Sequence, residues 1–471
     1  MTNVTVDVHH LTRVEGHGNI VVDVKNGELK QCELQIVETP RFFEAMLRGR
    51  PYGESSHITS RICGICAVGH ATASLRATEK ALDVQLSEQT KLLRRLLFHG
   101  EILDSHILHA YMLVAPDFLG VGSVIPLAKT APDVVLRALR MKKLAGDLCA
   151  AIAGRHTHPV AMTVGGFTHF PKARELQELR ARLEAMREDV TRTVELFMTL
   201  SMPDFVRDTE YIALHKPDEY CFIDGVIKST DGGEWPIEDY RKVTNEHIVK
   251  HSSAKHTRNQ RDSYMVGALA RFNVNYDLLH PLAKSAATAM GLKPKAINPY
   301  LNTVAQVVEI AHCMEDSIAL IDTLLARGVE WEDPAPPRRM SGEGTGSAEV
   351  PRGILFHNYV IEEGRVVGAN CIIPTGQNLA NIEADMRKLV PEKIAPFVVA
   401  LCSDAGRSVT GQIFGVRNNE IFLFSQPRPI RSAHTAEGWT PEAVAERVFP
   451  MFEKDFYPLH RSGDVFTWDP V

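Results

Sequence analysis

The residues with the clearest chemical potential are Cys63 and Cys66, two cysteines within the string RICGIC at residues 61–66. The C-x-x-C spacing puts both sulfur atoms on one side of a tight turn, close enough to hold one soft metal centre. Thiolate is the binding form, and we expect the neighbouring Arg61 to favour it. The spacing alone also fits a redox dithiol, half of a zinc site, or two buried cysteines without chemistry.

The full string is more informative than the spacing. Followed by His70, it resembles the N-terminal signature of the large subunit of nickel–iron hydrogenases. Further segments resemble that family in the same order along the chain: 13–17 (RVEGH), 40–44 (PRFFE), 47–50 (LRGR), 115–118 (APDF), 158–159 with 165–166, 351–353 (PRG) and 374–378 (PTGQN). The resemblance covers residues 1–388, which we expect to form a large-subunit-like domain.

The resemblance implies heterolytic H2 oxidation or proton reduction at a nickel–iron centre whose iron carries CO and cyanide. Electrons would pass to an iron–sulfur small subunit, then on to further electron-transfer subunits. In this family Cys63 would be a terminal nickel ligand and Cys66 a bridge to iron. Glu44 would belong to a magnesium (Mg2+) site near the subunit interface.

The resemblance also assigns roles to residues outside the cysteine pair. Glu15 would pass protons, which suits a carboxylate whose pKa is raised towards neutrality by burial. Arg352 would project over the metals as a permanently charged hydrogen-bond donor. The segment Pro374-Thr375 would donate a hydrogen bond to a diatomic ligand on iron, and His70 is counted with the cofactor-binding residues.

The sequence departs from this family at a second cysteine pair. The family's centre is held by four cysteines, the last two in a C-x-x-C preceded by Asp-Pro near the C-terminus. The other cysteines of the chain form no second C-x-x-C: they are Cys32, Cys149, Cys221, Cys313, Cys371 and Cys402. We therefore expect the activity to be impaired. The alternative is a catalytically inactive scaffold subunit, comparable to the quinone-side subunit of respiratory complex I.

Residues 389–471 resemble instead the C-terminal end of the short-chain dehydrogenases. The matching segments are 391–396 (PEKIAP), 409–415 (VTGQIFG), 420–425 (EIFLFS) and 439–442 (WTPE). That family's glycine-rich nucleotide loop and its Tyr-x-x-x-Lys pair are both absent, and a last strand cannot bind a dinucleotide without the sheet that it completes. A nucleotide-dependent dehydrogenase fragment is therefore the least favoured function, and we expect only an appended tail.

The pattern of apolar residues predicts the elements that position these groups. Alternation over 4–37 predicts an antiparallel meander, and residues 354–361 with 366–373 predict a hairpin. Helical spacing predicts long helices over 88–114, 133–153, 172–200 and 300–327. Residues 341–346, which read G-x-G-x-G from Gly342, are expected to be a flexible turn. The fold class is therefore α+β: a long-helix bundle with small antiparallel sheets and a strand-containing C-terminal tail.

Two groups of basic residues could also carry chemistry. His99, His106 and His109 lie near one face of the helix expected over 88–114, where packing or hydrogen bonding is favoured over metal ligation. The run from Lys250 to Arg261 contains His251 and His256 and is basic. A solvated surface is the favoured interpretation of this run, ahead of an anion or partner site.

Composition narrows the classes of partner. The 471 residues are 44% hydrophobic and 23% charged with a net charge of −6, which gives no reason to expect nucleic acid or an anionic membrane. No run of about 18 apolar residues predicts a membrane span. The charged N-terminus does not resemble a secretory signal, and eight cysteines are too few for a disulfide framework. We expect a cytoplasmic location.

Overall fold

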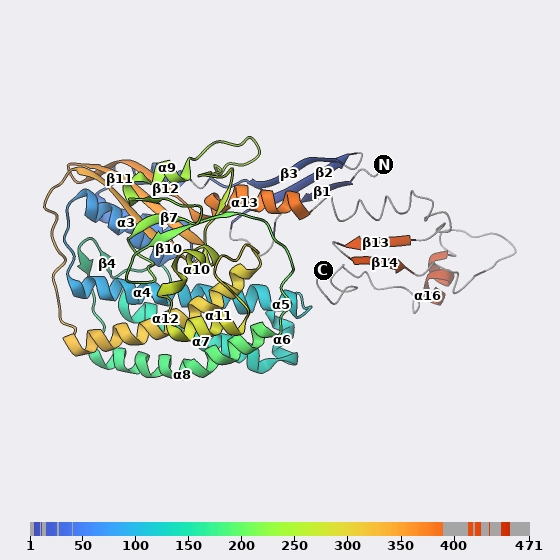
Figure 1. Cartoon of the computed structure of the whole chain (residues 1–471), viewed down its shortest axis with the longest axis horizontal. Helices are drawn as coiled ribbons and strands as arrows, with labels where there is room; N and C mark the ends of the chain where they lie inside the picture. Colours follow the sequence, from blue (N-terminus) through green and yellow to red (C-terminus); the bar gives the residue numbers. More distant parts are fainter. Residues whose placement is uncertain are drawn as a thin grey trace.

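The computed structural model describes residues 4–9, 11, 16–25, 28–39, 41–389, 413–417, 420–424, 433 and 444–452. Long helices form one layer and the sheets lie on the other side of the main body (Figure 1). This arrangement confirms the predicted α+β class. Among the described helices, none is both long enough and apolar enough to cross a membrane.

The helical layer is built from four long helices: α4 (Glu88–Ile107), α7 (Pro132–Ala153), α8 (Ala173–Met198) and α12 (Leu301–Arg327). Helix α4 packs against α7 and α12, and α12 also packs against α8. The apolar seam predicted for α8 is buried at each of its positions: Leu176, Leu179, Leu183, Met186, Val190 and Phe197. Residues 108–114, expected to continue α4 as an α-helix, form the π-helix η3 (Leu108–Val114) instead.

Shorter helices connect this layer to the sheets. They are α1 (Phe42–Leu47), α2 (Ser55–Thr59), α3 (Ala67–Ala81), α5 (Ala115–Phe118), α6 (Val124–Thr130), α9 (Tyr240–Thr244), α10 (Ala268–Asn275), α11 (Pro281–Ala289) and α13 (Pro374–Leu389), with the 3-10 turns η1 (Tyr52–Glu54), η2 (Ser60–Ile62), η4 (Ile237–Asp239) and η5 (Tyr276–Leu278).

The strands form several small sheets. The predicted N-terminal meander is β1 (Val4–Val8), β2 (Gly18–Lys25) and β3 (Glu28–Ile36), and the predicted hairpin is β11 (Gly353–Glu362) with β12 (Arg365–Ile372). A third sheet has the order β8 (Glu234–Trp235), β7 (Val226–Ser229), β6 (Glu210–His215) and β9 (Tyr264–Met265). Its β6–β9 pair is parallel, which the expectation of antiparallel sheets missed. Strands β4 (Met162–Thr163) and β5 (Gly166–Phe167) form a short pair.

The expectation of a flexible turn at residues 341–346 is wrong. These residues begin strand β10 (Gly342–Val350), which pairs along its whole length with β11. Its glycines lie against helix α3: a Cβ added to Gly346 would meet the carbonyl oxygen of Ala73 at 2.1 Å, and one added to Gly344 would meet that of Ala77 at 2.3 Å. The glycines therefore permit a close approach of strand and helix.

Only part of the C-terminal segment is described. Strands β13 (Ile413–Arg417) and β14 (Glu420–Phe424) form an antiparallel pair, followed by the π-helix η7 (Val444–Val448) and the short helix α16 (Phe449–Phe452). A helix expected over 394–402 lies outside the described residues. The division of the chain at residue 388 stays a prediction.

Candidate functional site

Cys63 and Cys66 lie in the short turn between η2 and helix α3. Both side chains are buried, each with 7% of its surface exposed. The backbone N–H of Cys66 donates to the sulfur of Cys63 at 3.1 Å, and the carbonyl oxygen of Cys66 accepts the backbone N–H of His70 at 3.1 Å. The C-x-x-C turn thus leads directly into the first turn of α3, which fixes both sulfur atoms against the helical layer.

The electrostatic surroundings of Cys66 favour its thiol form. The hydrogen bond with Cys63 and burial raise the pKa of Cys66 well above its usual value, while the Arg352 guanidinium acts in the opposite direction. Arg61, which we expected to favour the thiolate, is exposed. That expectation is wrong for Cys66, and the cation that acts on this thiol is Arg352, brought from about 290 positions away by the β10–β11 turn.

Sequence reasoning missed Glu101, which lies in α4 directly beneath the start of α3. Its carboxylate accepts the backbone N–H of Val68 at 2.6 Å and of Gly69 at 3.0 Å, so it neutralises unpaired donors of the first turn. Burial raises the pKa of Glu101, and the nearby Cys63 adds to this shift. A glutamate within the apolar run of α4 was the available signal.

Arg352 is held in place by a buried ionic network around Arg271 of α10. The Arg271 guanidinium forms ion pairs with Glu309 of α12 at 2.6 Å and with Glu349 of β10 at 3.1 Å. It also donates to the carbonyl oxygens of Val350 at 2.9 Å and Pro351 at 3.2 Å. Arg271 therefore connects the helical layer to the turn that carries Arg352.

The segment 374–378 approaches the same turn. The Asn378 side-chain amide donates to the carbonyl oxygen of Arg352 at 3.4 Å, and that of Gln377 donates to Ile354 at 2.6 Å. Pro374, which is buried, and Thr375, which is exposed, form the first turn of α13. The structure thus brings the 351–353 and 374–378 segments together through the backbone.

His70 lies one turn beyond the cysteines but pairs with another histidine. Its Nδ1 lies 3.2 Å from Nε2 of His357, whose Nδ1 lies 2.7 Å from the Tyr359 hydroxyl. Burial lowers the pKa of His70 to about 3 and that of His357 well below its usual value. Both rings are therefore neutral and connect α3 with β11.

Glu44 occupies a different place from the thiols. Its carboxylate accepts the backbone N–H of Cys371 at 2.8 Å and the Arg41 guanidinium at 2.7 Å. Arg41 also forms an ion pair with Glu246. Glu44 therefore joins α1 to β12, while Glu15 lies outside the described residues.

The three histidines of the α4 region take part in side-chain hydrogen bonds with α12. His106 pairs with Glu309 at 2.6 Å, His109 with Gln306 at 2.7 Å and His99 with Ser317 at 3.3 Å. The favoured interpretation of these residues as packing and hydrogen-bonding groups is confirmed.

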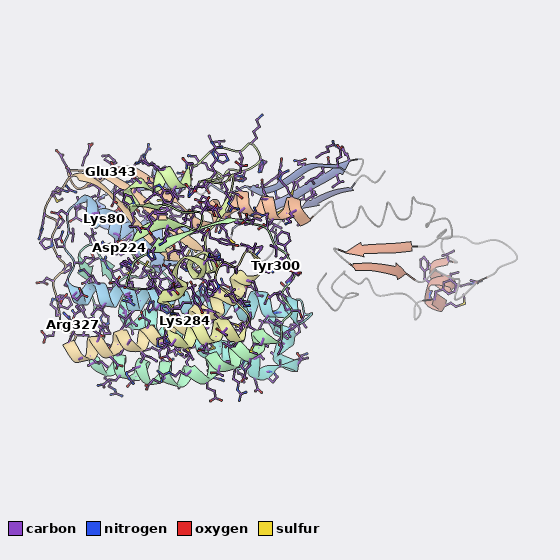
Figure 2. All side chains as sticks on the ribbon, viewed as in Figure 1. Lys80, Asp224, Lys284, Tyr300, Arg327 and Glu343 are labelled. Carbon is purple, nitrogen blue, oxygen red and sulfur yellow. The ribbon has the colours of Figure 1, made fainter. Side chains whose placement is uncertain are left out.

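A separate surface groove of 690 Å³ lies beside α3 and β10. Its lining includes Lys80, Glu238 and Glu343, and Figure 2 labels Lys80 and Glu343. No residue that the sequence analysis assigned to the site lines this groove. The lining mixes both signs of charge, so it offers no obvious site for one charged ligand.

The Arg271 network predicts a pH-dependent difference between its two carboxylates. Burial raises the pKa of Glu349 to about 7 from its ordinary value of 4.5, whereas burial at Glu309 is outweighed by Arg271, which lowers the pKa. Since folding raises the pKa of Glu349, the folded protein binds the extra proton, and its stability falls as pH rises between about 5 and 8. Glu349→Gln should remove this fall.

Urea unfolding at pH 6 and pH 8 measures the effect. We expect Glu349→Gln to match the parent protein at pH 6 and to exceed it at pH 8 by roughly 2 kcal/mol. Glu309→Gln should destabilise the protein at both pH values, because it removes the charged partner of Arg271. Equal costs for the two variants would contradict the assignment of the buried negative charge to Glu309.

Family models match two stretches of the chain. The model described as nickel-dependent hydrogenase matches residues 41–133 and 229–391, and one described as HoxL-like matches residues 5–39. The first model includes the cysteine pair, the Arg271 network and the Arg352 turn.

Individual proteins agree with this match. The alpha subunit of sulfhydrogenase 1 from Pyrococcus furiosus is 35% identical, with 82% of this chain and 90% of the relative covered. A subunit of the vhu F420-non-reducing hydrogenase from Methanocaldococcus jannaschii is 31% identical, with 80% and 96% covered. The solved NAD+-reducing [NiFe]-hydrogenase in its H2-reduced state superposes with a TM-score of 0.75 at 26% identity, covering 83% of this chain and 93% of that chain.

The comparisons give no support to the expected resemblance of residues 389–471 to the short-chain dehydrogenases. The antiparallel pairing of β13 with β14 also differs from the parallel sheet that such a tail would complete. The dehydrogenase alternative is therefore not carried further.

Proposed function

Because the chain belongs to the nickel-dependent hydrogenase family, we propose that it is a hydrogenase large subunit that works with an iron–sulfur small subunit on H2. The observation that carries this proposal is the buried Cys63–Cys66 pair, with the Arg352 guanidinium acting on Cys66 from the β10–β11 turn. A structural dithiol would not need a cation delivered from a distant segment.

The residues present do not fit a complete nickel–iron centre. The family resemblance calls for four thiolates, and the chain has one C-x-x-C pair. The nearby Glu101 is a hard oxygen donor already bonded to two backbone N–H groups, and Arg352 is a cation. An incomplete set of soft ligands lowers metal affinity and admits water. We therefore propose that the 471-residue chain holds the metals poorly and that its activity is impaired.

The remaining assignments belong to the same proposal. Glu15 as a proton-transfer residue, Pro374 and Thr375 beside the CO and cyanide ligands, and Glu44 at an Mg2+ site rest on the family resemblance. The acceptance of electrons by further subunits and a cytoplasmic location rest on it too. The same holds for the division into residues 1–388 and a C-terminal tail.

The direct test replaces residues 390–471 by the C-terminal segment of a relative that carries Asp-Pro-Cys-x-x-Cys. After co-expression with the maturation proteins and a small subunit, we expect H2-dependent dye reduction by the chimera and little or none by the parent chain. Cys63→Ser in the chimera should abolish this activity. Arg352→Lys should lower it by roughly 100-fold if the planar guanidinium is needed.

The surface variant Arg174→Gln in the chimera is the control, because Arg174 lies on the exposed face of α8 and pairs with Glu178 there. It should leave the dye reduction unchanged. A folded chimera that binds the small subunit but gives no turnover and no infrared bands of iron-bound CO and cyanide would favour the alternative, an inactive scaffold subunit.

A further inference from the structure

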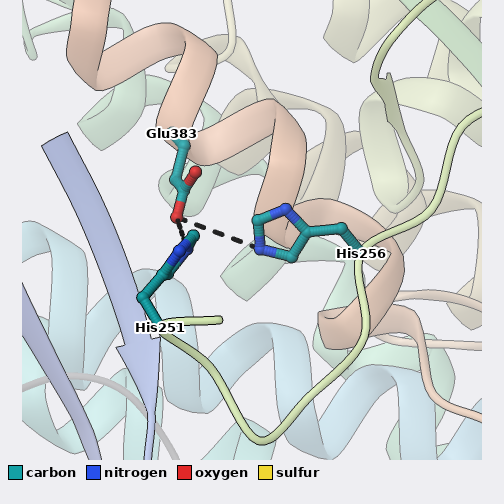
Figure 3. A group of neighbouring side chains, drawn as sticks. All are labelled: His251, His256 and Glu383. Carbon is teal, nitrogen blue, oxygen red and sulfur yellow. Dashed lines mark hydrogen bonds and ion pairs between the residues drawn. The ribbon is translucent and has the colours of Figure 1, made fainter. Parts of the chain in front are cut away.

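A second group of metal-binding residues lies apart from the cysteine pair. His251 and His256 come from the loop that precedes β9, and Glu383 comes from helix α13 (Figure 3). Their ligand atoms all lie within 4.8 Å of one another. The side chains are 19%, 5% and 9% exposed, in that order. The expectation that the basic run 250–261 is a solvated surface is therefore wrong for its two histidines.

One atom of this group has no partner. Nε2 of His256 is buried and makes no hydrogen bond among the described residues. It points towards Glu383, whose Oε1 lies 3.9 Å away, too far for a hydrogen bond. A buried polar atom without a partner costs roughly 1–3 kcal/mol, so its retention in this position calls for an explanation.

We propose that His251, His256 and Glu383 form a binding site for a divalent transition-metal ion of the Zn2+ class. Two imidazoles and one carboxylate are a common protein ligand set for Zn2+, with the fourth position left to water. This site is independent of the proposed hydrogenase function, since it uses neither of the two thiols.

The geometry suits such an ion. Metal–ligand distances of about 2.1 Å in a tetrahedral arrangement place neighbouring donor atoms about 3.4 Å apart. The His251–Glu383 separation of 2.7 Å and the His256–Glu383 separation of 3.9 Å lie on either side of this value. Small side-chain rotations would therefore bring the three donors around one ion and would satisfy the unpaired nitrogen of His256.

The surroundings also favour a cation. The Glu33 carboxylate lies 3.9 Å from Nδ1 of His251, on the far side of that ring from Glu383, where a carboxylate fixes the tautomer that leaves Nε2 free to bind. Burial lowers the pKa of His256, with Glu383 opposing, so its ring is neutral and able to bind a metal. The nearby cation Arg387 is engaged with the carbonyl oxygen of Cys32 at 2.8 Å.

Occupation of the site would connect three distant segments. The backbone N–H of Leu34 in β3 donates to Glu383 at 2.9 Å, so the carboxylate already joins the N-terminal sheet to α13. A bound ion would add the 251–256 loop to this contact. It would stabilise the folded protein because the unfolded chain has no preformed site.

Titration of the metal-free 471-residue chain with Zn2+ tests the proposal. The parent and a Cys63→Ser/Cys66→Ser variant, which lacks the thiols, should each bind one Zn2+ at this site and gain melting temperature. In the thiol-free background, His256→Leu and Glu383→Gln should each lower the affinity at least tenfold. His256→Leu should not lower the stability of the metal-free protein, because it removes an unpaired nitrogen. His247→Gln is the matched control: this ring lies 6.1 Å from that of His256 but outside the ligand group, and its affinity should be unchanged.

Co2+ provides a second readout that does not depend on the variants folding. In the thiol-free chain, visible bands of a four-coordinate Co2+ site without thiolate charge transfer would support the proposal. The absence of saturable binding to the thiol-free chain, or equal affinity in the parent and His256→Leu, would overturn it.

Discussion

Replacing Arg271 with methionine is expected to lower the free energy of unfolding by about 3–5 kcal/mol. The change leaves Glu309 ionised within the core, where Arg271 is its principal cation and is completely buried. It also removes the donors that bind the carbonyl oxygens of Val350 and Pro351. Methionine has a similar length, so lost packing contributes little to the difference.

Urea unfolding followed by circular dichroism measures this cost. Arg174→Met on the exposed face of α8 removes an arginine that also pairs with a glutamate, and it should leave stability unchanged within error. If Arg271→Met costs no more than this control, the Arg271 network does not support the fold. An Arg271→Met/Glu309→Leu double variant should recover part of the loss, because it removes the uncompensated charge.

Replacing Gly346 with alanine is expected to cost about 1–3 kcal/mol. An added methyl group would lie 2.1 Å from the carbonyl oxygen of Ala73 and 2.5 Å from the backbone nitrogen of Ala77. Both are backbone atoms of α3, so strand and helix must separate. The gain from a less flexible unfolded chain, about 0.4–1 kcal/mol, is too small to offset this.

Gly53→Ala is the matched control, because an added Cβ there meets no atom within 4 Å. Its unfolding midpoint in urea should be equal to or above that of the parent. An equally small change for Gly346→Ala would show that β10 does not depend on close contact with α3.

The long helices could be predicted because their signal is local. The seam of α8 repeats within the helix itself, and burial at Leu176, Leu183 and Val190 follows from that spacing. The nature of β10 could not be predicted in the same way. Glycine at alternate positions is typical of a flexible turn when read locally, and only the position of α3 makes it a strand that requires glycine.

The site was predictable where its chemistry is contained in one short string, as in the Cys63–Cys66 pair. Its supporting residues were not, since Arg271 lies 38 positions from Glu309 and 78 from Glu349. His251 and His256 belong to a basic run, and nothing in that run indicates that Glu383 of α13 would draw them inward. Tertiary contacts of this kind leave no periodic pattern in the sequence.

The central claim is that this hydrogenase large subunit carries only half of the thiolates that its metal centre requires. The most direct measurement is the nickel and iron content per chain, after co-expression with the maturation proteins and a small subunit. We expect well below one nickel per parent chain, and one nickel with one iron per chain in the chimera that carries a second C-x-x-C. Metal counts are to be taken in the His256→Leu background, so that the second site does not contribute. Stoichiometric nickel and iron in the parent chain, with H2-dependent dye reduction, would contradict the account.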